Sequence, residues 1–150
     1  FGTQYGDVPL SELFGDNSDL IVIHNMGKSC RFCTLWADGF SGLSVHLSDR
    51  AGFVVASPDT VQEQQDFAAS RDWNFPMVSC AENTFIDDMG FRGDNGGPLP
   101  GVSTFSRTSD GIITREGAAN FGPGDDFCST WHILDLLKDG VSEWMPQYSY

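Results

Sequence analysis

Apolar positions recur along the chain with two different periods, and the two periods predict alternating strands and helices. Short apolar runs rich in β-branched residues are typical of buried strands. Three such runs occur, at residues 20–26, 53–56 and 77–79. Between the first two runs, apolar residues recur at helical spacing and share one face, and these are Trp36, Phe40, Leu43 and Leu47. The pattern therefore predicts a helix over residues 33–47.

Two further helices are predicted by the residues at their ends. Thr60 and Glu63 have the spacing of a capping box, which opens a helix that runs to about Arg71. A last helix follows the aspartates at positions 125 and 126, because acidic residues favour a helix N-terminus. Its apolar residues continue to Leu137, and Gly140 ends it.

The second half of the chain also predicts a β-hairpin. Residues 87–101 hold five glycines and two prolines and therefore form a loop. Residues 102–107 and 112–115 then flank an Asp-Gly pair, a strong hairpin signal. The order of elements predicts an α/β fold with a central mixed sheet flanked by helices, a parallel core, and a C-terminal β-hairpin and helix. A length of 150 residues fits one domain, 1–150.

Charge narrows the choice of partners. The chain has 21 acidic and 8 basic residues, for a net charge of -13. Such a surface repels phosphate backbones and anionic lipids, so we expect no nucleic acid and no membrane partner. No apolar run approaches the roughly 20 residues of a membrane helix, and no signal peptide is visible. We therefore expect a cytoplasmic protein. Neither a Walker A nor a G-x-G-x-x-G element occurs, and we expect no cofactor.

Cys30 and Cys33 form a C-x-x-C motif after the first predicted strand and at the start of the first predicted helix. A helix N-terminus offers unpaired N–H groups and partial positive charge, which stabilise a thiolate. The two-residue spacer lets both sulfurs approach each other on one turn. Lys28 and Arg31 are the only charged side chains between residues 20 and 37, and both favour the thiolate. The motif therefore predicts a redox-active pair, supported by these two cations.

Other interpretations of these residues stay open. A zinc site would need two more ligands, and Cys80 and Cys128 do not form a second pair, so we expect no metal. The two motif thiols could also be buried and inert. His24, in the strand that leads to the motif, is either a proton acceptor that supports the cysteines or a core histidine satisfied by hydrogen bonds.

Four segments carry a resemblance to a known family: LIVIHNM at 20–26, CRFCTLWADGF at 30–40, DWNFPMVS at 72–79 and PGVSTF at 100–105. With them the chain resembles, over nearly its whole length, an uncharacterised bacterial domain-of-unknown-function family in the thioredoxin-like superfamily. Its layout is also similar to the peroxiredoxin and thioredoxin-like reductase branch, because Ser57-Pro58-Asp59 follows a strand and Phe75-Pro76 follows the next helix. The resemblance implies a thioredoxin fold and thiol redox chemistry.

Two departures from that branch bear on which cysteine attacks first. Thioredoxins place a cis-proline opposite the motif, and Ser103 stands at the matching place here; a non-proline cis bond costs ~2.5–4 kcal/mol, so we expect a trans bond. Peroxiredoxins usually place a threonine three residues before the attacking cysteine, and here Cys30 holds that position relative to Cys33. Cys30 is the nucleophile in a thioredoxin-type mechanism, and Cys33 in a peroxidase-type one.

The sequence thus supports two functions of different kinds. In the first, the protein is a thiol-disulfide oxidoreductase or thiol peroxidase, with a disulfide or peroxide as substrate and a thiol as reductant. One cysteine attacks as a thiolate and the other resolves the intermediate. In the second, the protein is a non-catalytic thioredoxin-like binding domain, because a fold does not by itself imply an activity.

Overall fold

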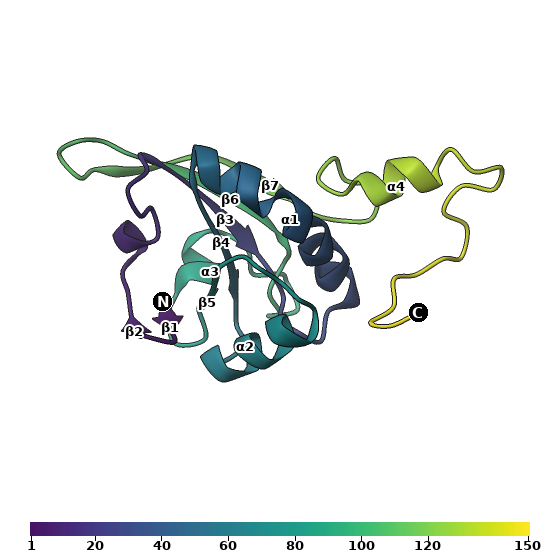
Figure 1. The fold of residues 1–150 in the computed structure, drawn as a ribbon, viewed down its shortest axis with the longest axis horizontal. Coiled ribbons are helices and arrows are strands. Elements are labelled where there is room, and N and C mark those ends of the chain that lie inside the picture. The colour runs from purple at the N-terminus through teal and green to yellow at the C-terminus, as the bar shows by residue number, and fades with distance from the viewer.

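The computed structural model describes all 150 residues and contains one seven-stranded sheet (Figure 1). The strands lie in the spatial order β2-β1-β5-β4-β3-β6-β7. Their bounds are Gly2–Thr3 for β1, Gly6–Asp7 for β2, Asp19–His24 for β3, Gly52–Ser57 for β4, Met77–Ser79 for β5, Gly101–Arg107 for β6 and Ile113–Asn120 for β7. Strands β3, β4 and β5 run parallel, whereas β6 pairs antiparallel with both β3 and β7. The predicted mixed sheet, with a parallel core and an antiparallel hairpin, is confirmed.

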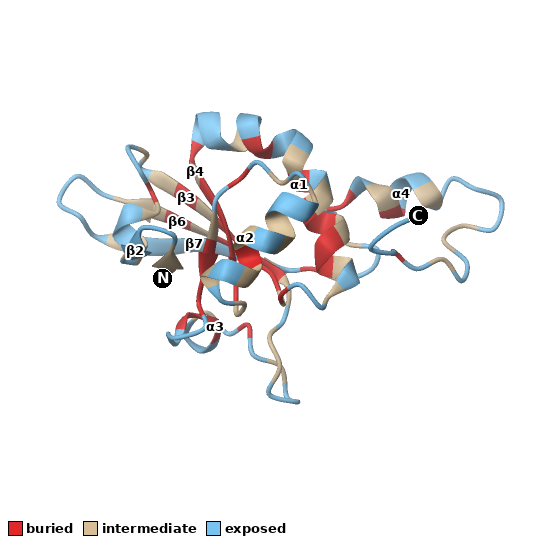
Figure 2. Ribbon diagram, turned by 60° about the horizontal axis from the view of Figure 1, so that its bottom comes forward, coloured by how far each residue is buried: buried red, intermediate tan, exposed pale blue.

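Three α-helices and one 3-10 turn connect these strands, and a fourth α-helix follows the last strand. They are α1 (Arg31–Arg50), α2 (Val61–Ser70), α3 (Phe85–Asp88) and α4 (Ser129–Leu134), with the 3-10 turn at Leu10–Glu12. Helices α1 and α2 join parallel neighbours, and right-handed crossovers place both on one face of the sheet (Figure 2). Arg71 at the end of α2 forms an ion pair with Asp38 of α1, which ties the two helices together. No helix has the length and apolar character that a membrane span requires.

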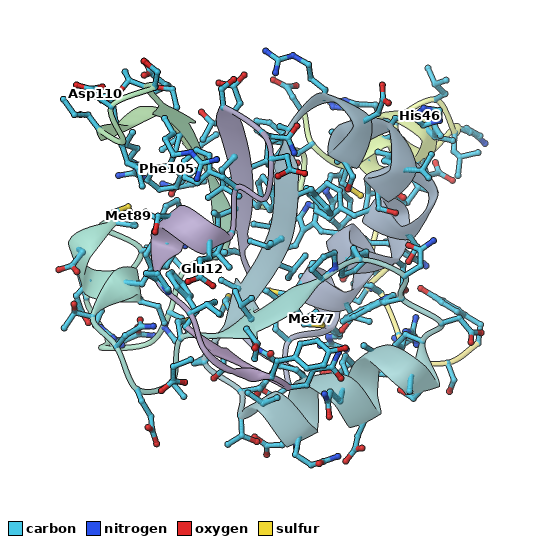
Figure 3. All side chains as sticks on the ribbon, turned by 60° about the vertical axis from the view of Figure 1, so that its left-hand side comes forward. Glu12, His46, Met77, Met89, Phe105 and Asp110 are labelled. Carbon is cyan, nitrogen blue, oxygen red and sulfur yellow. The ribbon has the colours of Figure 1, made fainter.

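Two apolar clusters fill the two faces of the sheet. Successive residues of β3 point to opposite faces, so that Val22 belongs to one cluster and Ile23 to the other. The first cluster lies under the N-terminal segment and α3, and Met89 and Phe105 pack there (Figure 3). The second lies under α1 and α4 and includes Cys33. Figure 2 shows buried residues in the central strands and on the inner side of α1, next to the cysteine motif.

The capping box predicted at α2 is present. The Thr60 hydroxyl accepts the Glu63 N–H, and a Glu63 carboxylate oxygen accepts the Thr60 N–H at 3.0 Å. We expect Thr60→Ala to lower the free energy of unfolding by about 1 kcal/mol, because one N–H of the first turn loses its partner. Urea denaturation measures this loss. Thr60→Ser keeps the hydroxyl and should stay within a few tenths of the wild-type value; equal losses in both variants would contradict the capping role.

The last helix is shorter than the sequence predicted. Helix α4 ends at Leu134, whereas the apolar spacing predicted a helix to Leu137. Ile133, Leu136 and Leu137 are 61%, 85% and 59% exposed. Tertiary packing of an apolar face provides most of the stability of a short helix. No surface covers this face, and the chain turns instead after Leu134.

Strand β7 is longer than predicted, and α3 was missed. The second strand of the hairpin continues past Arg115 to Asn120, pairing Gly117 and the two following alanines with β6. A register shift opposite Thr104 accommodates the extra residue Glu116. Small residues hide this strand from a pattern search because they show no apolar–polar alternation. Helix α3 has only four residues, too few for a helical period to show.

Candidate active site

A braced turn between β3 and α1 leads to the cysteine motif. The Asn25 side-chain oxygen accepts the Gly27 N–H at 2.8 Å. Gly27 has a φ of 103°, and a Cβ there would lie 2.9 Å from a carboxylate oxygen of Asp59, so the position requires glycine. The same carboxylate accepts the backbone N–H of Lys28 at 2.7 Å. The junction between β4 and α2 therefore fixes the path of the chain to Cys30.

Cys30 is the N-cap residue of α1. Its backbone is extended, and its Sγ accepts the Cys33 N–H at 3.1 Å. Its carbonyl oxygen accepts both the N–H and the hydroxyl of Thr34 at 3.0 Å. The Cys30 sulfur thus sits against the first turn of a 20-residue helix. N–H groups without helical partners and the positive end of the helix dipole both stabilise a thiolate at this position.

The two motif cysteines differ in exposure and acidity. Cys33 is 2% exposed, whereas Cys30 is half-buried. A hydrogen bond from the Cys33 side chain, with backbone N–H groups of Cys33 and Phe32, lowers the pKa of Cys30 to about 7 although burial acts in the opposite direction. The bond with Cys30 and the loss of solvent raise the pKa of Cys33 above its ordinary value. At neutral pH a large fraction of Cys30 is therefore thiolate, whereas Cys33 is a thiol.

Three residues beside the motif escaped the sequence analysis. Met26 places its Sδ 4.0 Å from the Cys30 Sγ, and its N–H donates to the Cys33 Sγ at 3.4 Å. The Trp131 ring of α4 lies 6.1 Å from the ring of Phe32. Trp144 of the C-terminal segment packs against the second apolar cluster, which contains Cys33, and burial and the Cys30 charge raise the pKa of Tyr148 in the same segment. Met26 lay in a run interpreted as strand, and the other two are distant in sequence and carry no local signal.

The two cations that the sequence predicted to support the thiolate, Lys28 and Arg31, have different surroundings in the structure. The Lys28 ammonium binds Glu63 of α2 at 2.9 Å; this bond raises the pKa of Lys28 and lowers that of Glu63 to about 2. Arg31 is the exposed first residue of α1, and its charge lowers the pKa of Tyr148, against the effect of the thiolate. The causes of the lowered pKa of Cys30 are hydrogen bonds within the first turn of α1.

His24 lies on the face of the sheet opposite the cysteines. Its ring stacks on Phe91 and Phe85, with centroids 3.8 and 5.2 Å away. Its Nε2 is 2.8 Å from the Ser103 hydroxyl, which also accepts a hydrogen bond from Arg115 at 2.9 Å. Burial and the Arg115 charge lower the pKa of His24 to about 3. The structure therefore does not bring this histidine to the sulfurs and satisfies it within the core.

The backbone beside the end of β3 contains no cis bond. All peptide bonds are trans, so Ser103 is trans as expected. The alignment that set Ser103 against the motif is wrong, however, because the strand register pairs Ser103 with Val22 and Gly101 with His24. Gly101 is therefore the residue of β6 that lies beside the turn into α1.

The two remaining cysteines lie apart from each other. Cys80 belongs to the first apolar cluster, and Cys128 to the second. No three or more histidine, cysteine or acidic side chains gather in a metal-binding arrangement. Two surface grooves, of about 660 and 370 Å³, lie along β1, β5 and α2, and neither is lined by a motif residue.

Comparisons with known proteins agree with this architecture. The model of the family described as "Bacterial protein of unknown function (DUF899)" matches residues 1–150. Among solved structures, the chain is similar to the peroxidoxin BcpB from Mycobacterium tuberculosis, with 27% identity, a TM-score of 0.58, and coverage of 78% of this chain and 77% of that one. Reduced Prx3 from Vibrio vulnificus is 14% identical, with a TM-score of 0.60 and coverage of 82% and 81%.

A third similar structure is the bacterioferritin comigratory protein of Xanthomonas campestris, which has alkyl peroxide reduction activity. It is 20% identical to this chain, with a TM-score of 0.57 and coverage of 77% and 76%. A comparison with curated proteins finds no match. The chain thus shares the thioredoxin-like fold of the peroxiredoxins, as the sequence resemblance implied.

Proposed function

The chain belongs to the bacterial family DUF899, and we propose that it is a thiol peroxidase in which Cys30 attacks a hydroperoxide and Cys33 then closes a disulfide. One observation carries this proposal: the motif pairs a half-buried N-cap cysteine, whose pKa is lowered to about 7, with a buried cysteine whose pKa is raised. A nucleophile needs thiolate character and access. A resolving thiol needs only proximity. The order of attack is therefore the thioredoxin-type order, with Cys30 first.

The proposed reaction has two steps and a recycling step. The Cys30 thiolate attacks one oxygen of the peroxide, the O–O bond breaks, and the products are an alcohol and the Cys30 sulfenic acid after uptake of one proton. The Cys33 thiol then attacks the Cys30 sulfur, which releases water and forms the disulfide. Residues three apart on a helix lie about 5–6 Å apart between Cβ atoms, so a modest adjustment of the first turn closes the bridge. A dithiol reductant restores both thiols.

Peroxide is favoured over a protein disulfide as substrate for two reasons. The likeness to a peroxidoxin at 27% identity supports it. Cys30 is also half-buried, which suits a small substrate better than a polypeptide. We place the reaction in the cytoplasm, where thiol reductants are present and free cysteines persist.

The three residues that the sequence predicted to support the cysteines differ in what they do in this proposal. Arg31, exposed at the first position of α1, adds positive potential at the entrance to the site. Lys28 acts mainly through its backbone N–H, which binds Asp59 and braces the turn. His24 holds Ser103 on the far face of the sheet and takes no part in proton transfer.

A peroxide assay tests the proposal. Reduced protein mixed with hydrogen peroxide should consume the peroxide and form a Cys30–Cys33 disulfide that peptide mass spectrometry locates. With dithiothreitol present, consumption should continue, and its rate should rise with pH through a midpoint at about pH 7, because only the thiolate attacks. Reaction with oxidised glutathione but not with peroxide would favour the thiol-disulfide oxidoreductase. Reaction with neither would leave the non-catalytic binding domain.

A further inference from the structure

Met26 contacts both sulfurs of the motif in different ways. Its thioether Sδ lies 4.0 Å from the Cys30 Sγ. Its backbone N–H donates to the Cys33 Sγ at 3.4 Å. The side chain is partly exposed at the turn between β3 and α1, as is Cys30. A third sulfur, oxidisable and in van der Waals contact with the nucleophile, therefore belongs to the same site.

We propose that Met26 is a second peroxide-reactive residue of this site and that the Cys30–Cys33 pair reduces its sulfoxide. The inference rests on the proposed function only in taking Cys30 as the nucleophile. In the first step the Met26 thioether takes one oxygen atom from a peroxide, which breaks the O–O bond and leaves an alcohol or water. The thioether is oxidised by two electrons, and the peroxide is reduced by two.

The repair step balances with the two motif thiols as the only reductant. The Cys30 thiolate attacks the sulfoxide sulfur, the oxygen passes to Cys30 with uptake of a proton, and Met26 leaves as the thioether. The products of this step are a Cys30 sulfenic acid and an intact methionine. The Cys33 thiol then displaces water from the sulfenic acid and forms the disulfide. The separation of 4.0 Å between the two sulfurs sets the attacking atom against its target before any rearrangement.

The contact between Met26 and Cys30 also makes the repair selective for Met26 over the other methionines. A sulfoxide is polar and chiral, so oxidation of Met26 would replace an apolar contact of Cys30 with a strong acceptor beside the thiolate. The other methionines, Met77, Met89 and Met145, have no hydrogen bond to a cysteine. Met89 is half-buried and packs against the first apolar cluster, on the face of the sheet opposite the motif cysteines. It therefore serves as an internal control.

The test starts from protein treated with diamide, which closes the Cys30–Cys33 disulfide, and then with excess hydrogen peroxide, which oxidises methionines. The disulfide protects both cysteines from further oxidation. After removal of peroxide, dithiothreitol is added and the sulfoxide content of each methionine peptide is followed by mass spectrometry. At least about half of the Met26 sulfoxide should disappear, since a chiral site favours one of the two epimers. The Met89 sulfoxide should persist.

Cys30→Ser is the matched control, and it should retain its Met26 sulfoxide in dithiothreitol. Three results would overturn the inference: persistence of the Met26 sulfoxide in the wild type, equal loss at Met26 and Met89, or equal loss at Met26 in Cys30→Ser. Because diamide forms the disulfide without peroxide, the test does not depend on peroxidase turnover. A protein that consumes peroxide yet keeps its Met26 sulfoxide refutes only the repair. A protein that repairs Met26 but loses its peroxide consumption in Met26→Leu refutes only direct attack on peroxide by Cys30.

Discussion

Replacing Cys30 by serine should abolish dithiol-dependent peroxide consumption, by a factor on the order of 10³ or more, because a serine hydroxyl without a base does not form the anion that attacks. Cys33→Ser should differ in kind. It keeps the nucleophile, so it should still consume a first equivalent of peroxide rapidly and accumulate a Cys30 sulfenic acid that a dimedone probe labels. The pair of variants thus distinguishes attack by Cys30 from attack by Cys33, which the sequence left open.

The control for these variants is Cys80→Ala. Cys80 lies in the cluster on the other face of the sheet, and burial raises its pKa to about 11, so it should be inert towards peroxide. Its replacement should leave peroxide consumption within about twofold of the wild type. If Cys33→Ser no longer consumes a first equivalent of peroxide and Cys30→Ser still does, the peroxidase-type order with Cys33 as nucleophile would be correct.

The part of this site that depends on local sequence could be predicted. The apolar run at 20–26 and the helical spacing after Cys33 place the motif at a strand-to-helix junction, and the structure does so too. Hydrogen bonds within one turn, from the Cys33 side chain and then from backbone N–H groups, decide the acidity of Cys30, and such short-range effects follow from spacing. The strand nevertheless ends at His24, two residues earlier than predicted, because Asn25 and Gly27 form the turn.

The parts of the site that depend on distant contacts could not be predicted. Alternation along β3 sends His24 to the far face, but only the strand register and the position of α3 show which partners it meets there. The sequence shows no acidic partner near Lys28, but Glu63 of α2 forms an ion pair with it. Trp131 approaches Phe32 only because α4 returns over α1. One-dimensional patterns record which faces are apolar and not which side chains meet across elements.

The second large effect concerns acid stability, and its source is the buried His24. Its pKa in the folded chain is about 3, lowered by burial and then by Arg115, whereas an exposed histidine titrates near ~6.5. A depressed pKa means that protons prefer the unfolded chain. The stabilisation is therefore complete above about pH 6.5 and is lost as the pH falls from there towards about 3, by at most ~1.4 kcal/mol per pH unit.

Between pH 7 and pH 4 this residue should reduce the free energy of unfolding by about 3 kcal/mol. Carboxylates add their own acid dependence, so the measurement must be a difference between variants. Urea denaturation of the wild type and of His24→Gln over this pH range should show the variant less stable at pH 7, since it loses the stack on Phe91. The difference in free energy of unfolding between the wild type and His24→Gln should become smaller or change sign at pH 4.

His46→Gln provides the matched control. His46 is exposed on α1 (Figure 3), and its removal should leave the pH dependence parallel to that of the wild type. The expected loss of stability in acid comes only from the His24 ring, which packs against Phe85 and Phe91 and lies beside the polar groups of Ser103 and Arg115. If the free energy of unfolding of His24→Gln also changes in parallel with that of the wild type from pH 7 to pH 4, the folded chain accommodates a charged His24. The assignment of His24 as a neutral core residue would then be wrong.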